Sequence, residues 1–227
     1  MIEVITATRL SEPDFRAQSW LARSLRQVAP GIPVRAACDN TRGLPEVYNE
    51  AIEAADPGAT LVFAHDDVWI LDRDFARSLA RALGTYEVVG VVGNARRAPG
   101  QTAWVSADGE RPDVQNLRGR IAHPHGALGR DFADTVFQTE EYGLTPARVR
   151  ILDGVLLAAR AQTFRSTGVR LDPQFQFHLY DLDLCRALDA SGVTMGVWPI
   201  DLAHASRGGL TKEWRGAREA YLRKWDS

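Results

Sequence analysis

The 227-residue chain is 45% hydrophobic and 25% charged, which is typical of a folded globular protein and excludes intrinsic disorder. Its 27 basic and 29 acidic residues give a net charge of -2, which excludes a global electrostatic attraction to nucleic acid or anionic membranes. The two cysteines lie far apart, no apolar run is long enough to cross a bilayer, and the first residues do not show the basic and then apolar pattern of an export signal. We therefore expect a cytoplasmic protein without a cysteine zinc site or a disulfide framework.

The first 94 residues alternate between strand-like and helix-like patterns. Strands are predicted at residues 2–8, 34–38, 61–64 and 88–93, and helices at 14–28, 44–55 and 73–83. Pro13 precedes the first of these helices and Pro30-Gly31 follows it, as proline and glycine often do at helix boundaries. Strands that alternate with helices favour a parallel sheet. The pattern therefore predicts half of an open α/β sheet, of the size that binds a nucleotide.

The remainder of the chain begins with an irregular stretch and then becomes regular again. Residues 95–148 contain scattered Gly, Pro, His and Arg with few apolar runs, and such an insert is usually functional or mobile. A strand is predicted at residues 149–158, a helix at 181–190, a short strand at 195–200 and a closing helix at 212–225. At this length we expect one α/β domain over residues 1–227, with a central, mostly parallel sheet flanked by helices.

The most informative motif is His65-Asp66-Asp67, which follows the apolar run Leu61-Val62-Phe63-Ala64. Aspartates fit poorly inside a strand, so we expect them at the rim where the strand ends, which is where open α/β sheets bind ligands. Two adjacent carboxylates repel each other unless a cation offsets them, and oxygen ligands suit a hard ion such as Mg²⁺ or Mn²⁺. Taken alone, an Asp-Asp pair is more often a turn or a helix cap.

Four further polar islands interrupt apolar sequence, namely Asp39-Asn40, Asp153-Gly154, residues 178–183 and residues 204–209. In this order, and with His65-Asp66-Asp67, they resemble the nucleotide-sugar-dependent glycosyltransferases of the GT-A fold. In particular, they resemble a small family-two-like branch related to streptomycin-pathway glycosyltransferase-like proteins. The resemblance covers about residues 34–210 and includes Asn40-Thr41-Arg42-Gly43-Leu44, Tyr48-Asn49-Glu50-Ala51-Ile52, Leu152-Asp153-Gly154-Val155-Leu156 and His178-Leu179-Tyr180-Asp181-Leu182-Asp183.

The resemblance implies that residues 1–94 form the half that binds a nucleotide-diphospho-sugar donor. His65-Asp66-Asp67 occupies the acidic motif that holds ribose and a divalent cation in the family. Asp67 is the implied metal ligand, His204 is the implied second ligand, and the implied cofactor is Mn²⁺ or Mg²⁺. The residues for which a nucleotide contact is implied are Thr6, Asp39, Asn49, His65 and Asp66.

The resemblance also implies that residues 149–227 form the acceptor half and the closing helix. Relatives carry an acidic pair at the start of a helix, and Asp181 aligns with its second member as the general base of an inverting transfer. Acceptor contacts are implied for Asp153, Gly154, His178 and Asp183. Taken alone, Asp181 is as well explained as a helix N-cap. An acid at position 153, inside so apolar a run, is hard to explain by structure only, because burial without a partner is expensive.

Two positions depart from the family pattern, since His65 and Tyr180 stand where many relatives carry acids. One alternative is therefore a catalytically silent module that binds a nucleotide sugar. Another is a metal-dependent nucleotidyltransferase, although such enzymes normally have a glycine-rich phosphate loop near the N-terminus, and residues 6–13 contain no glycine. The sequence leaves open the donor base, the sugar, the acceptor and the oligomeric state.

Overall fold

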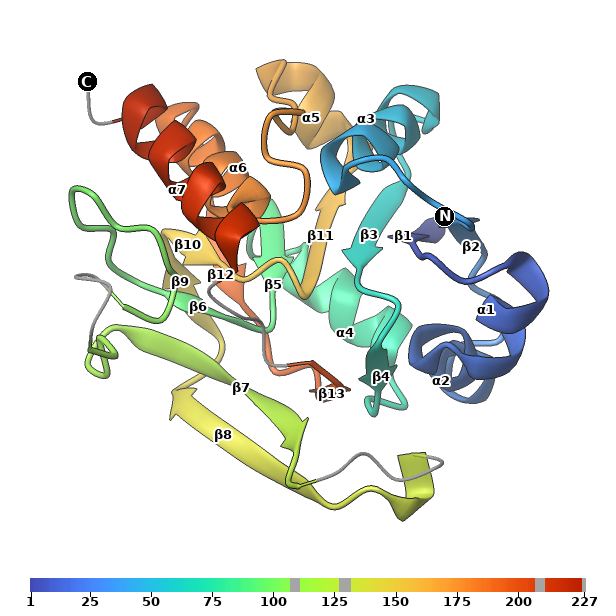
Figure 1. The fold of residues 1–227 in the computed structure, drawn as a ribbon. Helices are drawn as coiled ribbons and strands as arrows, with labels where there is room; N and C mark the ends of the chain where they lie inside the picture. Colours follow the sequence, from blue (N-terminus) through green and yellow to red (C-terminus); the bar gives the residue numbers. More distant parts are fainter. Residues whose placement is uncertain (107–110, 127–131, 207–210, 226–227) are drawn as a thin grey trace.

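A seven-stranded sheet forms the middle layer of the computed structural model, with helices on both of its faces (Figure 1). The structure describes residues 1–106, 111–126, 132–206 and 211–225, so part of the predicted insert at 95–148 lies outside the described residues. In spatial order the strands are β2 (Val34–Ala37), β1 (Ile2–Ala7), β3 (Thr60–Ala64), β11 (Leu156–Arg160), β5 (Val88–Gly90), β12 (Met195–Val197) and β9 (Ala147–Val149).

The strand directions in this sheet are mixed. β1 runs parallel to β2 and β3, and β12 runs parallel to β5. β11 is antiparallel to both of its neighbours, and β9 is antiparallel to β12. β1, β2, β3, β5 and β12 thus run in one direction, and β11 and β9 run in the other. The predicted α/β class with a central, mostly parallel sheet flanked by helices is confirmed, whereas the reversal of β11 and β9 was not predicted. A strand that is buried on both faces is apolar throughout, so its sequence does not reveal its direction.

Successive side chains of the central strands point to opposite faces of the sheet, and both faces are buried. Val4 and Val62 pack on one face against α2 and α4, whereas Ile5 and Phe63 pack on the other against α3, α5, α6 and α7. The helices are α1 (Glu12–Gln18), α2 (Trp20–Val28), α3 (Leu44–Ala54), α4 (Phe75–Ala82), α5 (Ala161–Thr167), α6 (Tyr180–Ala190) and α7 (Lys212–Trp225). Because each fully buried large apolar side chain contributes roughly 1.5–3 kcal/mol, this two-sided core fixes the positions of the strand ends.

The chain also forms a second sheet in the order β10-β6-β7-β13-β4, with β8 paired to β7 (Figure 1). Its strands are β10 (Ile151–Leu152), β6 (Val92–Asn94), β7 (Leu117–Pro124), β13 (Leu202–His204), β4 (Val68–Ile70) and β8 (Phe137–Gly143). Residues 88–93, predicted as one strand, divide at Val91 between the two sheets. The stretch 95–148, predicted to be irregular, contains the β7–β8 hairpin and the short 3-10 helix η1 (Phe132–Asp134).

The predicted helix at residues 14–28 is two helices that meet at Ser19. The Ser19 hydroxyl caps α2 by accepting from the N–H of Ala22 at 3.3 Å, and it donates to the backbone carbonyl of Asp66 at 2.7 Å. Serine favours such caps because its side chain satisfies an N–H group that the first turn leaves without a partner. Ser19, at the break between the two helices, therefore holds the start of α2 against the turn that follows β3.

The predicted strand at residues 149–158 is likewise divided, into the end of β9, the short β10 and the start of β11. The interruption lies at Asp153-Gly154. Oδ1 of Asp153 accepts from the N–H of Val155 at 2.8 Å, a local hydrogen bond by which aspartate favours a turn over an extended strand. This turn places Asp153 and Gly154 at the edge of the second sheet and not inside a continuous strand.

The predicted closing helix is present as α7, which packs beside α6 (Figure 1). Tyr221 is its fully buried anchor, and Trp214, Leu222 and Trp225 are partly buried against the same core. No helix within the described ranges is both long and apolar enough to cross a bilayer. The cytoplasmic location stays a prediction.

Candidate functional site

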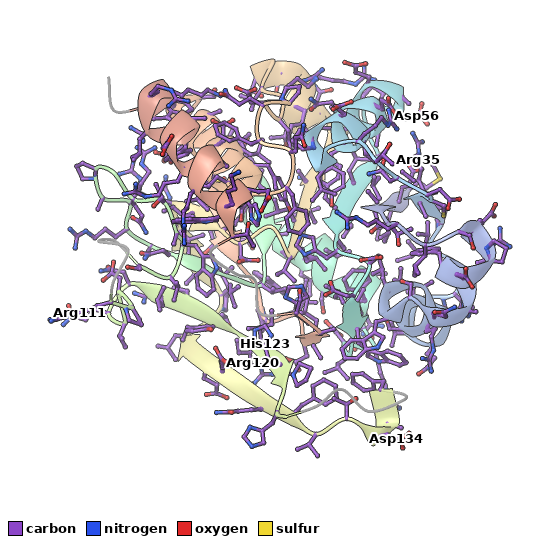
Figure 2. The ribbon with its side chains drawn as sticks, in the orientation of Figure 1. Arg35, Asp56, Arg111, Arg120, His123 and Asp134 are labelled. Carbon is purple, nitrogen blue, oxygen red and sulfur yellow. The ribbon has the colours of Figure 1, made fainter. Side chains whose placement is uncertain are left out.

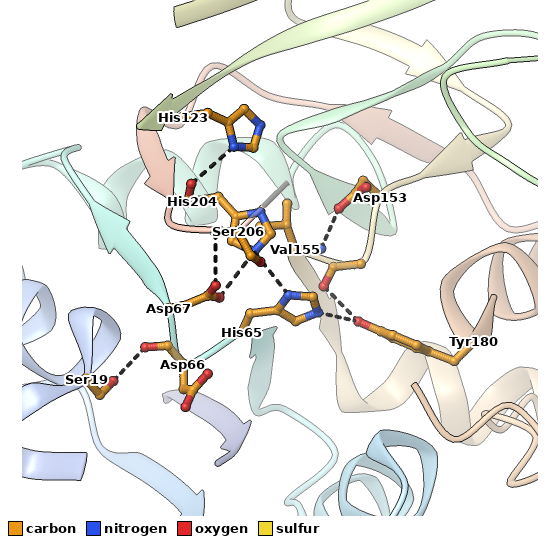
Figure 3. A network of polar contacts seen from close by, with 11 residues as sticks. Ser19, His65, Asp66, Asp67, His123, Asp153, Val155, Tyr180, His204 and Ser206 are labelled. Atoms are coloured by element: carbon orange, nitrogen blue, oxygen red, sulfur yellow. Dashed lines mark hydrogen bonds and ion pairs between the residues drawn. The ribbon is translucent and has the colours of Figure 1, made fainter. Parts of the chain in front are cut away.

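The turn between β3 and β4 carries His65, Asp66 and Asp67, whose side chains point in three directions (Figure 3). Asp66 lines one cavity, His65 lines a second, and Asp67 contacts the chain that follows β13. The motif marks the end of β3 because ionisable side chains are costly inside a strand that is buried on both faces. Phe177 lines both cavities and stacks on His65 with ring centroids 5.8 Å apart, so the two cavities are adjacent.

The first cavity, which we call the strand-end cavity, has a volume of about 950 Å³ and lies where β1 and β2 end. Asp39 and Asp66, both predicted nucleotide contacts, line it together with Thr8 and Arg9. The Thr8 hydroxyl donates to Oδ2 of Asp66, and burial raises the pKa of Asp66 although this hydrogen bond favours the carboxylate. Arg9 is exposed and forms no ion pair with any residue that the structure describes. The cavity therefore offers hydrogen-bond acceptors beside an available cation.

Two other predicted nucleotide contacts lie elsewhere. Thr6 is fully buried within β1, where its hydroxyl has no hydrogen-bond partner among the described residues. The Asn49 side chain donates to the carbonyl of Leu171 at 2.8 Å and accepts from the N–H of the same residue at 3.0 Å. Asn49 thus fastens α3 to the segment after α5. Neither side chain lines the strand-end cavity, and we do not retain them in the candidate site.

Asp67 pairs with His204, as expected for two ligands of one cation. β13 is antiparallel to β4 with His204 opposite Val68, which brings the imidazole beside the turn. Nε2 of His204 lies 3.2 Å from Oδ1 of Asp67, and the N–H of Ser206 donates to Oδ2 at 3.2 Å. Burial alone would raise the pKa of Asp67, but His204 and Ser206 outweigh it and hold the pKa well below its usual range. Burial also opposes the charge of His204, yet the Asp67 carboxylate raises the pKa of His204.

His65 completes a cluster of three donor groups (Figure 3). Its Nδ1 lies 3.4 Å from Nε2 of His204, and the ligand atoms of His65, Asp67 and His204 all lie within 4.8 Å of one another. Burial first, and then the charge of His204, lower the pKa of His65, which keeps the ring neutral and one nitrogen free to accept. Two imidazoles and one carboxylate are a donor set that suits a divalent cation. His65, predicted as a nucleotide contact, is thus placed toward the metal cluster.

Behind His65 lies a short chain of polar contacts. Nε2 of His65 is 3.1 Å from the hydroxyl of Tyr180, and this hydroxyl donates to the carbonyl of Gly154 at 3.0 Å. The contact requires glycine at position 154, because a Cβ there would lie 2.3 Å from the Tyr180 hydroxyl. Burial raises the pKa of Tyr180 well above its usual value, so the side chain stays a phenol.

The second cavity, which we call the central cavity, has a volume of about 500 Å³ and lies on the His65 side of the turn. Three carboxylates line it, those of Asp153, Asp181 and Glu140. His123 on β7 lines it as well, and its Nδ1 is 3.1 Å from the backbone oxygen of His204 (Figures 2 and 3). The aromatic side chains of the lining are Trp104, Tyr142, Phe177, Tyr180 and Trp214. Carboxylates and flat apolar rings together suit a ligand that carries both hydroxyl groups and apolar faces.

Asp181 faces the central cavity from the first turn of α6. Its Oδ2 accepts from the N–H of Gly154 at 2.9 Å, so the carboxylate is held by the turn that interrupts the predicted strand. Burial first, and then the nearby Asp153, raise the pKa of Asp181 to about 7. The N-cap of α6 is Leu179 and not Asp181, and Leu179 adopts φ 63, a left-handed conformation that costs a non-glycine residue roughly 1–2 kcal/mol. Strain of this kind is often found where a functional side chain must be aimed.

The remaining predicted acceptor contacts divide between cavity and core. His178 lines the central cavity, and its Nε2 is 3.4 Å from Oγ1 of Thr211. Asp183 is only 1% exposed and lines neither cavity. Its Oδ1 accepts from Nε1 of Trp225 at 2.7 Å, and its Oδ2 accepts from Nζ of Lys224 at 3.0 Å. Asp183 therefore fastens α7 to α6, and the geometry gives no support to an acceptor contact.

Several side chains of the site have no role predicted from the sequence, and Thr8, Tyr180 and Phe177 show why. Thr8 follows the last residue of β1, and the rule that strand ends carry ligand contacts would have found it had the end of the strand been placed at Ala7. The sequence marks Tyr180 only as the replacement of an acid, because its partners His65 and Gly154 are distant in sequence. Phe177 has no local signal that separates it from an ordinary core residue, although it is 56% exposed.

Comparisons with known proteins agree with this geometry. A family model described as "Glycosyltransferase like family" matches residues 30–216, which is most of the chain. No curated protein matches the chain. Among solved structures, the chain is similar to GalNAc-T7 with UDP, GalNAc and Mn²⁺, at 11% identity and a TM-score of 0.53, over 99% of this chain and 48% of that one.

A second similar structure is the mannosyltransferase PcManGT from Pyrobaculum calidifontis in complex with GDP-Man and Mn²⁺. The identity is 13% and the TM-score 0.51, over 97% of this chain and 61% of that one. The chain thus spans about half the length of GalNAc-T7 and about three fifths of the length of PcManGT. At such low identities the likeness concerns the fold alone, and it shows that the chain has the GT-A glycosyltransferase fold.

Proposed function

Because the chain belongs to the glycosyltransferase-like family, we propose that it transfers a sugar from a nucleotide-diphosphate donor to an acceptor hydroxyl at the junction of its two cavities. One observation carries the proposal. The turn at residues 65–67 sends Asp66 into the strand-end cavity and His65 into the central cavity, where Asp181 also lies. Reaction between two bound substrates requires adjacent binding sites, since holding both reactants together removes much of the entropic barrier.

The donor nucleotide is assigned to the strand-end cavity. Asp39 and Asp66 are acceptors that suit base and ribose donors, and Arg9 supplies positive charge for an anionic ligand. GalNAc-T7 and PcManGT were solved with UDP and GDP-Man, and the corresponding proposal here is a nucleotide sugar whose base is not specified. The diphosphate would extend from this cavity toward Asp67.

A divalent cation is assigned to the cluster of His65, Asp67 and His204. The donor set fits, because it provides two nitrogen atoms and one carboxylate oxygen within a small volume, on the turn whose Asp66 lines the donor cavity. Both similar structures were solved with Mn²⁺. When bound, the cation would act as a Lewis acid that stabilises the negative charge of a departing diphosphate.

The acceptor is assigned to the central cavity, with Asp181 as general base. As the acceptor oxygen bonds to the anomeric carbon, the bond from that carbon to the diphosphate oxygen breaks and Asp181 takes the hydroxyl proton. A base with a pKa of about 7 balances availability against proton affinity at neutral pH. Attack opposite to the leaving group would invert the anomeric centre. Asp153 and Gly154 would form the floor of this site, and His178 its side.

The proposal is tested first with purified protein and the UDP, GDP and dTDP derivatives of common sugars, each with and without Mn²⁺. Thermal shift and calorimetry identify the donor, and release of the nucleoside diphosphate reports turnover by hydrolysis or transfer. We expect one donor class to bind and to be consumed. The matched variants are Asp181→Asn in the central cavity and Asp201→Asn, which removes a partly exposed ion pair with Arg120.

Asp181→Asn should leave donor binding intact and lower turnover by about 10²- to 10⁴-fold, which is the usual contribution of a general base. Asp201→Asn should change neither quantity. Donor binding without any turnover in the native protein would instead favour a silent nucleotide-sugar-binding module. No binding of any nucleotide sugar would remove the proposed function.

A further inference from the structure

We propose that Tyr180 positions His65 as a third metal ligand beside Asp67 and His204, and that this ligand set favours Co²⁺ and Zn²⁺ over Mg²⁺. The inference rests on the proposed function only in that the same cluster would hold the cation of the transfer reaction. It concerns the choice of ion and the residue behind the ligand, both of which can be measured with the metal alone.

The argument begins with the single proton of the Tyr180 hydroxyl. The carbonyl of Gly154 can only accept, so the contact of 3.0 Å between them requires the hydroxyl to donate its proton there. The hydroxyl then has only lone pairs to offer to His65, at 3.1 Å. That second contact is favourable only if Nε2 of His65 carries a hydrogen. Tyr180 therefore selects the Nε2–H tautomer and leaves the lone pair on Nδ1.

The free Nδ1 lone pair is on the side of the ring that faces the other two donor groups. Nδ1 lies 3.4 Å from Nε2 of His204, which in turn lies 3.2 Å from Oδ1 of Asp67. Two nitrogen atoms that each lie about 2.0–2.1 Å from one tetrahedral ion are separated by about 3.4 Å. These two spacings match one tetrahedral ion, and the three ligand atoms, which all lie within 4.8 Å of one another, would close around it by a small movement of the side chains.

The ion preference follows from the chemistry of the ligands. Mg²⁺ prefers an octahedral set of oxygen atoms and retains several waters, so a carboxylate at position 65 would suit it. Imidazole is a better ligand for ions such as Co²⁺ and Zn²⁺. A ligating histidine is usually held by a hydrogen bond on its other ring nitrogen, and loss of that partner typically weakens metal binding about 10- to 100-fold. Tyr180 occupies that place behind His65.

The test is a double-mutant cycle on the full chain after treatment with a chelator, with Co²⁺, Zn²⁺ and Mg²⁺ titrated in the absence of nucleotide. His65→Asp should lower the ratio of Co²⁺ affinity to Mg²⁺ affinity at least about tenfold. Tyr180→Phe should weaken Co²⁺ and Zn²⁺ binding about 10- to 100-fold, and it should have no further effect in the His65→Asp background. The control is Tyr48→Phe, which removes a buried hydroxyl with no hydrogen-bond partner among the described residues, from a ring 6.1 Å from that of Tyr180.

Nuclear magnetic resonance of the His65 ring supplies a measurement that needs no variant. We expect the His65 ring to carry its hydrogen on Nε2 before Zn²⁺ is added and to bind Zn²⁺ through Nδ1 afterwards. Hydrogen on Nδ1, an unchanged ion preference in His65→Asp, or an equal effect of Tyr180→Phe in both backgrounds would overturn the inference. Failure of Co²⁺ to bind would do so as well. If glycosyl transfer persists in any of these cases, the proposed function is not affected. If the ions bind as expected but no transfer occurs, only the proposed function is refuted.

Discussion

Asp181→Asn should change the stability of the protein in a way that depends on pH. Burial and the neighbouring Asp153 raise the pKa of Asp181 from the ordinary 3.8 to about 7 in the folded state. The folded protein therefore holds this proton over a pH range in which the unfolded chain has already released it. For a raised folded-state pKa, stability is fully present below pH 3.8 and is lost as the pH rises toward 7.

The size of the effect follows from the width of that range. One pKa unit corresponds to about 1.4 kcal/mol, so between pH 4.5 and 7 the native protein should lose about 3 kcal/mol at this position. Because an asparagine does not titrate, the Asp181→Asn variant should not lose these roughly 3 kcal/mol of unfolding free energy between pH 4.5 and 7. Asparagine also has one carbonyl oxygen, whereas Asp181 accepts from the N–H groups of both Gly154 and Leu182. The missing acceptor should cost roughly 1–3 kcal/mol at every pH.

The two effects together predict a change of sign. At pH 4.5 the Asp181→Asn variant should be less stable than the native protein, and at pH 8 it should be the more stable of the two. Urea unfolding, followed by the fluorescence of the six tryptophans, measures the free energy of unfolding across this range. The difference between variant and native protein should rise by about 3 kcal/mol from pH 4.5 to pH 8.

A control and an activity measurement complete this experiment. Asp201→Asn, at an exposed pair, should give a difference in stability that does not vary in this way with pH. The kcat/KM of the native enzyme should rise with pH and level off above about 7, because only the deprotonated carboxylate of Asp181 can take the acceptor's proton. A flat difference in stability for Asp181→Asn would refute the raised pKa, and with it the physical basis for choosing this residue as the base.

Three further variants separate the roles of neighbouring residues. Asp67→Ala should weaken Mn²⁺-dependent nucleotide binding without unfolding the protein, and unchanged affinity by calorimetry would remove it from the metal site. Gly154→Ala should lower the melting temperature and turnover together, because its Cβ would lie 2.3 Å from the Tyr180 hydroxyl, and a variant as stable as the native protein would contradict this contact. Asp183→Ala should destabilise the protein by about 2–4 kcal/mol in urea titrations, because it leaves Nε1 of Trp225 without its acceptor and Lys224 with Asp172 alone, while donor affinity stays the same.

Local sequence patterns predicted most elements of the first half correctly, because a helix or strand there is set by its own periodicity and its flanking breakers. They failed where one apolar run serves two sheets. Residues 88–93 divide at Val91, and residues 149–158 divide at Asp153, yet both runs are apolar enough for one strand. The sequence contains the signal for the second break, since an aspartate followed by glycine favours a turn. For the first break the signal is weaker, since Gly90 lies directly before Val91 and a glycine inside a strand pattern can mark a bend.

The site was predicted best where a residue follows a strand and worst where its role depends on a distant partner. Asp66 and Asp67 lie in the turn after β3, where Asp66 lines the strand-end cavity and Asp67 belongs to the candidate metal cluster. Asn49 looked like a ligand contact, but it bonds to Leu171, 122 positions away. Asp183 shared the acidic pattern of Asp181, yet its partners lie in a closing helix about 40 residues later. No local pattern distinguishes a polar side chain that binds a ligand from one that binds its own chain.

The two departures from the family pattern, His65 and Tyr180, are separated by 115 positions, and each read alone resembles the loss of a functional acid. In the structure they touch, and Tyr180 is tied to the same Gly154 whose N–H holds Asp181. Loss of function at two independent positions gives no reason for the replacements to be complementary. Here the Tyr180 hydroxyl can orient the His65 imidazole, which in turn faces Asp67 and His204. This is what we expect if both replacements arose together as a change of metal ligands. This complementarity favours an active enzyme with an altered metal site over a silent binding module, and the cycle between the two residues measures it directly.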